Sequence, residues 1–183
     1  MPPEQTSSEY LALRAKVDEF CRAATESSQG ALRCEAGCHG CCVAELSVSP
    51  VEAQMLSRAL DALPSATREA LRADAPTAAG CVLLDATGRC SVYASRPLVC
   101  RTQGLALAYP ADLIPEEAIM GRDAQGRDVT YCPLNFTEQT PAADAVLDAE
   151  RVDQLLALIN RRFCEAHGLD PETREGLEAL LMA

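Results

Sequence analysis

The chain has 183 residues, the length of one ordinary domain, so we expect a single domain spanning residues 1–183. Its formal net charge of −11 argues against a nucleic-acid partner, because phosphate binding requires clustered Lys and Arg. The start of the chain lacks the features of a secretory signal, and no apolar run is long enough to cross a bilayer, so we expect a cytoplasmic protein with no membrane partner.

The first part of the chain predicts three helices. Between residues 8 and 28, apolar side chains recur at spacings of three and four and define one buried face: Tyr10, Leu13, Val17, Phe20 and Ala24. A second helix start combines a hydroxyl N-cap, a proline and a carboxylate at Ser49, Pro50 and Glu52, and this helix should end near Leu63. Ser65 begins a shorter helix that runs through Ala73.

The period changes in the middle of the chain. The segment CVLLDATGRCSVY, residues 81–93, has two short apolar runs around a polar turn and predicts a β-hairpin. Pro97 suits the start of one or two helical turns. The segment GLALAYP is compatible with a strand, and GRDAQGRD indicates a turn.

The last part of the chain is again helical. From about Ala142 to Gly168 we expect a long amphipathic helix whose buried side is formed by Val146, Val152, Leu155, Leu156, Ile159 and Phe163. Asp170 and Pro171 should start a last short helix. The predicted fold is mainly α with a small β-hairpin (α+β, irregular). Helical flanks at 8–28 and 142–183 enclose a cysteine-rich middle, and we expect bound metal to cross-link this middle segment.

Ten cysteines in a reducing compartment indicate metal ligands or catalytic groups rather than a disulfide framework. The segment CEAGCHGCC has the cysteine spacing of zinc knuckles and is close to that of iron-sulfur loops, and Gly37 and Gly40 allow the backbone to turn toward sulfur. The side chains of adjacent Cys41 and Cys42 diverge. We therefore expect one of them to bind the metal and the other to face a second site, a buried wall or a reactive opening.

The later cysteines extend this group. The predicted hairpin brings Cys81 close to Cys90, and Cys100 can fold back beside them after the turn at Pro97. One four-sulfur site with spare thiols and two separate sites are both compatible with the sequence. Arg96 and Arg101 lie close to these cysteines in the chain, and their guanidinium groups would lower thiol pKa values and donate hydrogen bonds to the sulfurs.

The segments CEAGCHGCC and CVLLDATGRCSVYASRPLVCR resemble the bacterial CxxCxxCC (YkgJ-like) family of zinc- or iron-chelating, iron-sulfur cysteine-cluster proteins. The resemblance covers a module of about residues 34–132. It implies eight candidate metal ligands: Cys34, Cys38, Cys41, Cys42, Cys81, Cys90, Cys100 and Cys132. The module also resembles part of larger flagellin lysine methylases, in which a metal centre would support enzyme chemistry.

The preferred function is binding of an iron-sulfur cluster or Zn²⁺, with the iron-sulfur cluster slightly favoured. One alternative is an enzyme or enzyme accessory that uses the centre for redox chemistry or substrate activation. Another is a redox-responsive interaction module whose acidic surface binds a basic protein. Neither His39 nor His167 lies in a recognised nucleophile motif, so we name no catalytic residue and lean against an enzyme. His39 remains a less favoured ligand, and we expect Cys21 and Cys164 to be buried in helices.

Overall fold

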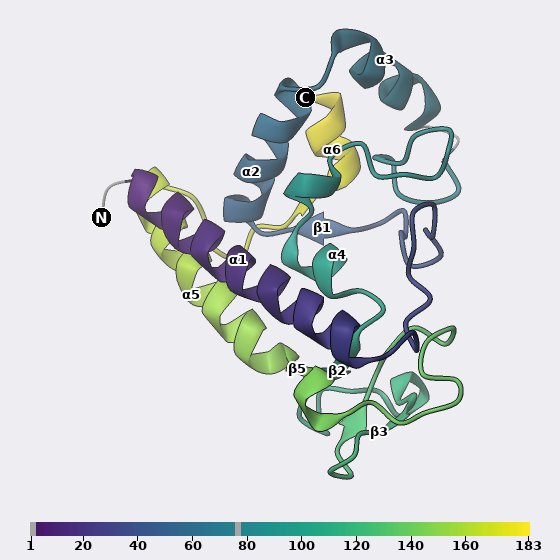
Figure 1. Ribbon diagram of the computed structural model, residues 1–183. Coiled ribbons are helices and arrows are strands. Elements are labelled where there is room, and N and C mark those ends of the chain that lie inside the picture. The colour runs from purple at the N-terminus through teal and green to yellow at the C-terminus, as the bar shows by residue number, and fades with distance from the viewer. Residues whose placement is uncertain (1–2, 76–77) are drawn as a thin grey trace. The chain divides into compact units, whose positions relative to one another are not determined.

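The computed structural model describes residues 3–75 and 78–183 (Figure 1). In these residues the α-helices are α1 (Pro3–Ser27), α2 (Pro50–Asp61), α3 (Ser65–Asp74), α4 (Leu98–Thr102), α5 (Ala149–His167) and α6 (Leu177–Met182). The strands are short: β1 (Ser47–Val48), β2 (Ala106–Ala108), β3 (Gly121–Arg122), β4 (Asp128–Val129), β5 (Val146–Asp148) and β6 (Glu175–Gly176). The predicted fold class, mainly α with small β elements, is confirmed. None of the described helices has the length and apolar character needed to cross a membrane.

The chain forms two compact units, each built from separate stretches of sequence. Unit 1 consists of Met1–Tyr10, Ala36–Cys100 and Ile159–Ala183. Unit 2 consists of Leu11–Glu35 and Arg101–Leu158. Parts of the predicted metal-binding module therefore belong to both units, and the expectation that the whole chain is one domain stays a prediction.

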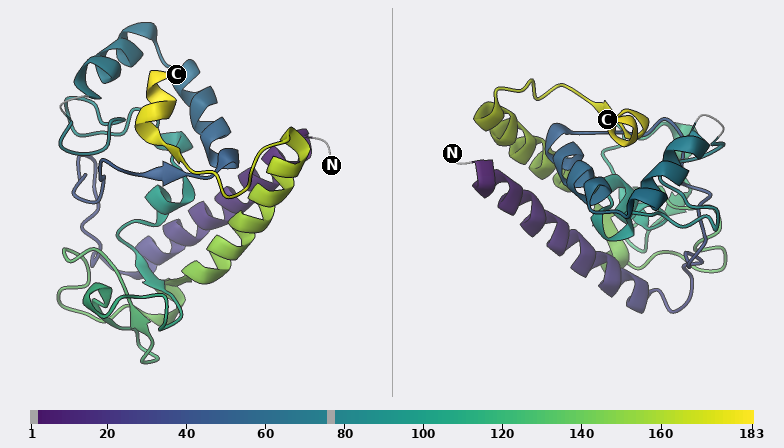
Figure 2. Two further views of the ribbon diagram at one scale, coloured as in Figure 1. Left: turned by 180° about the vertical axis from the view of Figure 1, so that it is seen from behind. Right: turned by 90° about the horizontal axis from the view of Figure 1, so that it is seen from above.

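The core of unit 1 lies between α2, α3 and α6. Its fully buried members include Val48, Leu56 and Leu181, which lie on β1, α2 and α6. In Figures 1 and 2, α6 lies beside α2 and α3, and it contacts both helices. Burial of these apolar faces stabilises unit 1 by about 25 cal/mol for each Å² removed from water. Cys81 and Cys90 pack against the same core, so this core supports two of the predicted ligands.

The predicted start of the second helix is confirmed. The hydroxyl of Ser49 donates to Oε2 of Glu52 at 2.9 Å, and the backbone N–H of Ser49 approaches the same oxygen at 3.4 Å, which forms a capping box at the start of α2. In the same unit, the first turns of α1 lie beside the last turns of α5, with an ion pair between Glu9 and Arg162 at 3.4 Å.

The last helix begins later than predicted. Asp170 and Pro171 form a turn, in which the Asp170 carboxylate accepts the N–H of Glu172 at 3.0 Å, instead of starting a helix. The chain then adds β6, whose Glu175 pairs with Val48 of β1 in antiparallel register. Helix α6 starts only after this pairing, at Leu177. Asp170 and Pro171 thus act as turn residues. The pairing of β6 with the distant strand β1 sets the later start of α6.

Unit 2 is built around short strands. Strand β2 pairs in parallel with β5, with Ala106 opposite Val146, and β3 pairs with β4 across the GRDAQGRD turn. A small core of Ala106, Val129, Phe136 and Val146 lies between these segments. GLALAYP, which is compatible with a strand, thus contains β2, and the turn predicted in GRDAQGRD is present.

The long C-terminal helix also begins later than predicted. Val146 belongs to β5, because its backbone pairs with β2, and α5 starts only at Ala149. Of the side chains expected on the buried face, Ile159 and Phe163 are buried, whereas Leu155 is 38% exposed. The predicted apolar face of α1 is better supported, because four of its five members are buried and Phe20 is half-buried.

Candidate metal centre

The first cysteine cluster meets the hairpin segment through the backbone. The N–H of Cys81 donates to the carbonyl oxygen of Cys42 at 3.0 Å. The preceding residue, Gly80, lies so close that a Cβ there would be 3.0 Å from the same carbonyl oxygen. A glycine at position 80 therefore permits this close approach between two segments far apart in the sequence.

The predicted hairpin is confirmed in a minimal form and carries two of the candidate ligands. Leu84 and Cys90 form an isolated antiparallel bridge, and the N–H of Asp85 donates to the carbonyl oxygen of Arg89 at 2.8 Å. Gly88 completes the turn with a φ of +75°, a conformation that suits glycine. This turn returns the chain toward its start, which brings Cys90 near Cys81.

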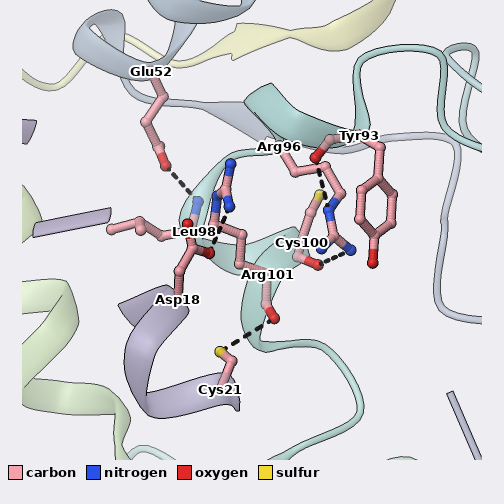
Figure 3. Close-up of polar contacts among 8 residues, drawn as sticks. All are labelled: Asp18, Cys21, Glu52, Tyr93, Arg96, Leu98, Cys100 and Arg101. Atoms are coloured by element: carbon pink, nitrogen blue, oxygen red, sulfur yellow. Dashed lines mark hydrogen bonds and ion pairs between the residues drawn. The ribbon is translucent and has the colours of Figure 1, made fainter. Parts of the chain in front are cut away.

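Helix α4 carries the next candidate ligand, Cys100, and a buried carboxylate holds the start of that helix. Glu52 of α2 is only 3% exposed, and its Oε1 accepts the backbone N–H of Leu98 at 3.0 Å (Figure 3). The guanidinium of Arg96 donates to the carbonyl oxygen of Cys100 at 3.2 Å and lies 3.6 Å from the centre of the Tyr93 ring (Figure 3). These contacts fix the orientation of the short segment that contains Cys100.

Four half-buried thiols of unit 1 lie near enough to influence one another's protonation, and we name them the four-thiol group: Cys42, Cys81, Cys90 and Cys100. Burial is the main cause that raises the pKa of each of them. In Cys100, burial and then the negative charges of the other three members raise the pKa from 9.0 to about 12. Deprotonating the group in this environment is costly unless a cation compensates the charge.

Arg96 acts electrostatically on this group. Its positive charge lowers the pKa values of Cys42, Cys90 and Cys100, although burial outweighs that effect. Arg101, the other arginine named from the sequence, belongs to unit 2, where its guanidinium binds Asp18 at 2.5 Å (Figure 3). The role predicted for Arg96 thus has an electrostatic basis, and that of Arg101 stays a prediction.

The chemistry of the donor set fits zinc or iron, since four thiols are the usual ligands of structural zinc and of iron-sulfur clusters. The positions of these thiols in the described part of the chain do not form a complete metal coordination sphere. Across residues 3–75 and 78–183, no three side chains of His, Cys, Asp or Glu are placed to hold one ion together. The members of the four-thiol group are therefore near one another, but they do not surround a single ion-binding position.

The remaining candidate ligands are not members of the four-thiol group. Cys34, Cys38 and Cys41 are exposed. The thiol of Cys41 makes a side-chain hydrogen bond with Cys42, which lowers the pKa of Cys42. Cys34 belongs to unit 2, as does half-buried Cys132. Their roles as metal ligands stay predictions.

Three other residues can now be placed. The ring of His39 packs over Gly88, where an added Cβ would lie 3.0 Å from its Cδ2. Cys164 is fully buried, as expected, whereas Cys21 is half-buried and its thiol approaches the carbonyl oxygen of Arg101 at 3.6 Å (Figure 3). The packing of His39 on the hairpin turn helps to attach the first cysteine loop to the second cysteine segment.

Sequence reasoning missed two residues that organise these segments. The sequence predicts Glu52 only as a helix cap, because its bond to Leu98 joins residues 46 positions apart. Asn135 was not singled out at all, although it is 1% exposed and makes several polar contacts in unit 2. An isolated polar residue between Leu134 and Phe136 was the only local signal for it.

Comparison with known proteins supports a metal-binding role. A family model named CxxCxxCC, with the description "putative zinc- or iron-chelating domain", matches residues 33–131, more than half of the chain. The matched region includes the whole four-thiol group. No curated protein and no solved structure matches the chain.

Proposed function

Because the chain belongs to the CxxCxxCC family of zinc- or iron-chelating domains, we propose that it binds its metal centre through the four-thiol group: Cys42, Cys81, Cys90 and Cys100. The main observation in support is that half-buried thiols from three separate segments influence one another's pKa within one compact unit. A divalent ion or a cationic cluster would compensate the charge that burial otherwise disfavours. The family description supports zinc or iron in general.

Between the two metals, an iron-sulfur cluster is the first choice and zinc the second. An iron-sulfur cluster is held by four thiolates, and a nearby positive charge such as that of Arg96 offsets the excess negative charge of the ligands. Zinc would bind the same four sulfurs in a closed tetrahedral site. Either centre would cross-link the loop at Cys42, the hairpin and α4, and so stabilise the segments between the helical flanks.

Binding is expected to be coupled to a local rearrangement. No three metal-binding side chains in the described part of the chain are placed to share an ion, so the sulfurs must approach one another when metal binds. The loop that ends at Cys42 contains Gly37 and Gly40 and is largely exposed, which allows such a movement. Metal binding would then contribute directly to the folding free energy of this region.

The test is anaerobic purification of the full chain, followed by an absorption spectrum and by analysis of iron, acid-labile sulfide and zinc. Iron with sulfide and broad visible absorbance supports the cluster, and stoichiometric zinc in a colourless protein supports the second choice. The variants Cys90→Ser and Cys100→Ser should lose the metal. Cys21→Ser is the matched control, because Cys21 is also half-buried but belongs to unit 2.

Far-UV circular dichroism of each variant accompanies the metal analysis and separates loss of metal from loss of folding. Loss of metal with retained helix content in Cys90→Ser supports the assignment. Full metal content in both Cys90→Ser and Cys100→Ser would contradict it. Absence of iron and zinc from the wild-type chain, even after anaerobic reconstitution, would contradict metal binding by this chain altogether.

The second candidate function, an enzyme or enzyme accessory that uses the centre, is favoured by one observation. Cys41 is an exposed thiol that is hydrogen-bonded to a member of the four-thiol group. A reactive sulfur beside a metal centre suits redox chemistry or substrate activation. If Cys41→Ser keeps its metal but loses reactivity toward an alkylating agent, whereas Cys42→Ser loses the metal, this candidate gains support. Loss of metal in both variants would make Cys41 a ligand instead.

A further inference from the structure

Two thiols of unit 2 lie against the same glycine, although they are far apart in the sequence. A Cβ added at Gly104 would lie 2.7 Å from the sulfur of Cys34 and 3.8 Å from the Cβ of Cys132. Gly104 has a φ of +90°, so both its conformation and its lack of a side chain are required at this point. The structure thus brings Cys34 and Cys132 to one location.

A buried asparagine joins the three segments that meet there. The side-chain N–H groups of Asn135 donate to the carbonyl oxygen of Gly104 at 2.6 Å and approach the sulfur of Cys34 at 3.6 Å. Its Oδ1 accepts the backbone N–H of Arg33 at 2.7 Å, and its own backbone N–H donates to the carbonyl oxygen of Cys132 at 2.8 Å. Because Asn135 is 1% exposed, these bonds hold in place the backbone of Cys132 and that of Arg33, the residue before Cys34.

The two thiols differ in accessibility. Cys34 is exposed and Cys132 is half-buried. The Asn135 amide lies 3.6 Å from the Cys34 sulfur and helps to hold it beside Gly104. A reagent from solution therefore meets Cys34 first, and Cys132 is the neighbour that can react afterwards.

We propose that Cys34 and Cys132 form a dithiol site that a small-molecule disulfide oxidises to an intramolecular disulfide. The thiolate of Cys34 attacks one sulfur of the reagent, the reagent's S–S bond breaks, and a mixed disulfide forms with release of one small thiolate. The thiolate of Cys132, after losing its proton to solvent, then attacks the Cys34 sulfur and displaces the second small thiolate. Two protein thiols are oxidised, one reagent disulfide is reduced to two thiols, and electrons balance.

This site contains no member of the four-thiol group, and its residues belong to the other unit. It assigns a reaction to two cysteines that the sequence named only as candidate metal ligands. The disulfide would join the segment after α1 to the segment after β4 and would restrict the unfolded chain, which adds stability to unit 2 under oxidising conditions.

The experiment uses the full chain as purified, treated with oxidised glutathione, then alkylated and mapped by mass spectrometry of its peptides. We expect one dominant disulfide, between the peptides containing Cys34 and Cys132. Cys132→Ser should accumulate glutathione on Cys34, since the second step is blocked. Cys34→Ser should form no disulfide at Cys132, and Cys21→Ser, the control in the same unit, should behave as the wild type.

A positioning role for Asn135 is tested by the rate of glutathione addition to Cys34 in the Cys132→Ser background. Asn135→Asp keeps the oxygen that accepts the Arg33 N–H but lacks the N–H groups that hold the Gly104 carbonyl oxygen and the Cys34 sulfur, so we expect addition to slow about tenfold or more. Its circular dichroism shows whether unit 2 remains folded. The proposal is overturned if the wild-type chain pairs Cys34 or Cys132 mainly with other cysteines, or if Cys34 gains glutathione but no disulfide follows.

Discussion

The buried carboxylate of Glu52 offers the sharpest test of how the candidate site is held together. One oxygen closes the capping box of α2 with Ser49, and the other accepts the N–H of Leu98 at the start of α4. Glu52 and Leu98 are each only 3% exposed, so water cannot replace the lost partner. Replacing Glu52 by Ala therefore removes a helix cap and the carboxylate that accepts a buried N–H.

The expected cost can be worked out from these contacts. Loss of a hydrogen bond from a buried N–H to a carboxylate costs about 1–3 kcal/mol, and loss of the cap costs about 1 kcal/mol. Glu52→Ala should therefore lower the free energy of unfolding by roughly 2–4 kcal/mol. Glu52→Gln keeps an oxygen for Leu98 but loses the acceptor of the Ser49 N–H, so its cost should be about 1 kcal/mol.

The assay is urea denaturation in the presence of a chelator, so that metal binding does not contribute to the stability. Glu69→Ala is the matched control, because Glu69 is an exposed glutamate on α3, and its effect should remain within about 0.5 kcal/mol. In a second assay, Glu52→Ala should also weaken metal binding, since α4 carries Cys100. A Glu52→Ala protein as stable as the Glu69→Ala protein would refute this account of α4.

Three further predictions concern the thiols and their surroundings. Because the pKa of Cys100 is raised to about 12, the metal-free folded chain keeps protons that the unfolded chain loses above pH 9. Its free energy of unfolding should fall between about pH 9 and 12 in urea titrations, and less steeply in Cys100→Ser; a slope unchanged by the substitution would contradict the burial of this thiol. Arg96→Ala should weaken metal affinity about 10- to 100-fold in a competition assay with a coloured chelator, because a positive charge that favours three thiolates is removed; unchanged affinity would exclude that role. Gly104→Ala should be less stable than Gly126→Ala by about 1–3 kcal/mol in urea, since both glycines have a positive φ but only the first would place a methyl group against the sulfur of Cys34; equal stabilities would argue against that contact.

The sequence by itself determined the elements whose signals are local. The apolar face of α1, the capping box at Ser49, the hairpin from Cys81 and the cysteine-rich loop are each specified by residues within a few positions of one another. Period, capping and turn chemistry act over that range, so these features could be predicted without knowledge of the rest of the chain. The matched family region corresponds closely to the predicted module.

The tertiary structure alone decided which distant residues meet. The parallel pairing of β2 with β5 moved the start of α5, and the pairing of β1 with β6 moved the start of α6. The same kind of contact placed Cys34 and Cys132 beside Gly104 and joined Glu52 to Leu98. Cysteine spacing along the chain cannot specify these groupings, because they follow from backbone pairing and burial between segments tens of residues apart.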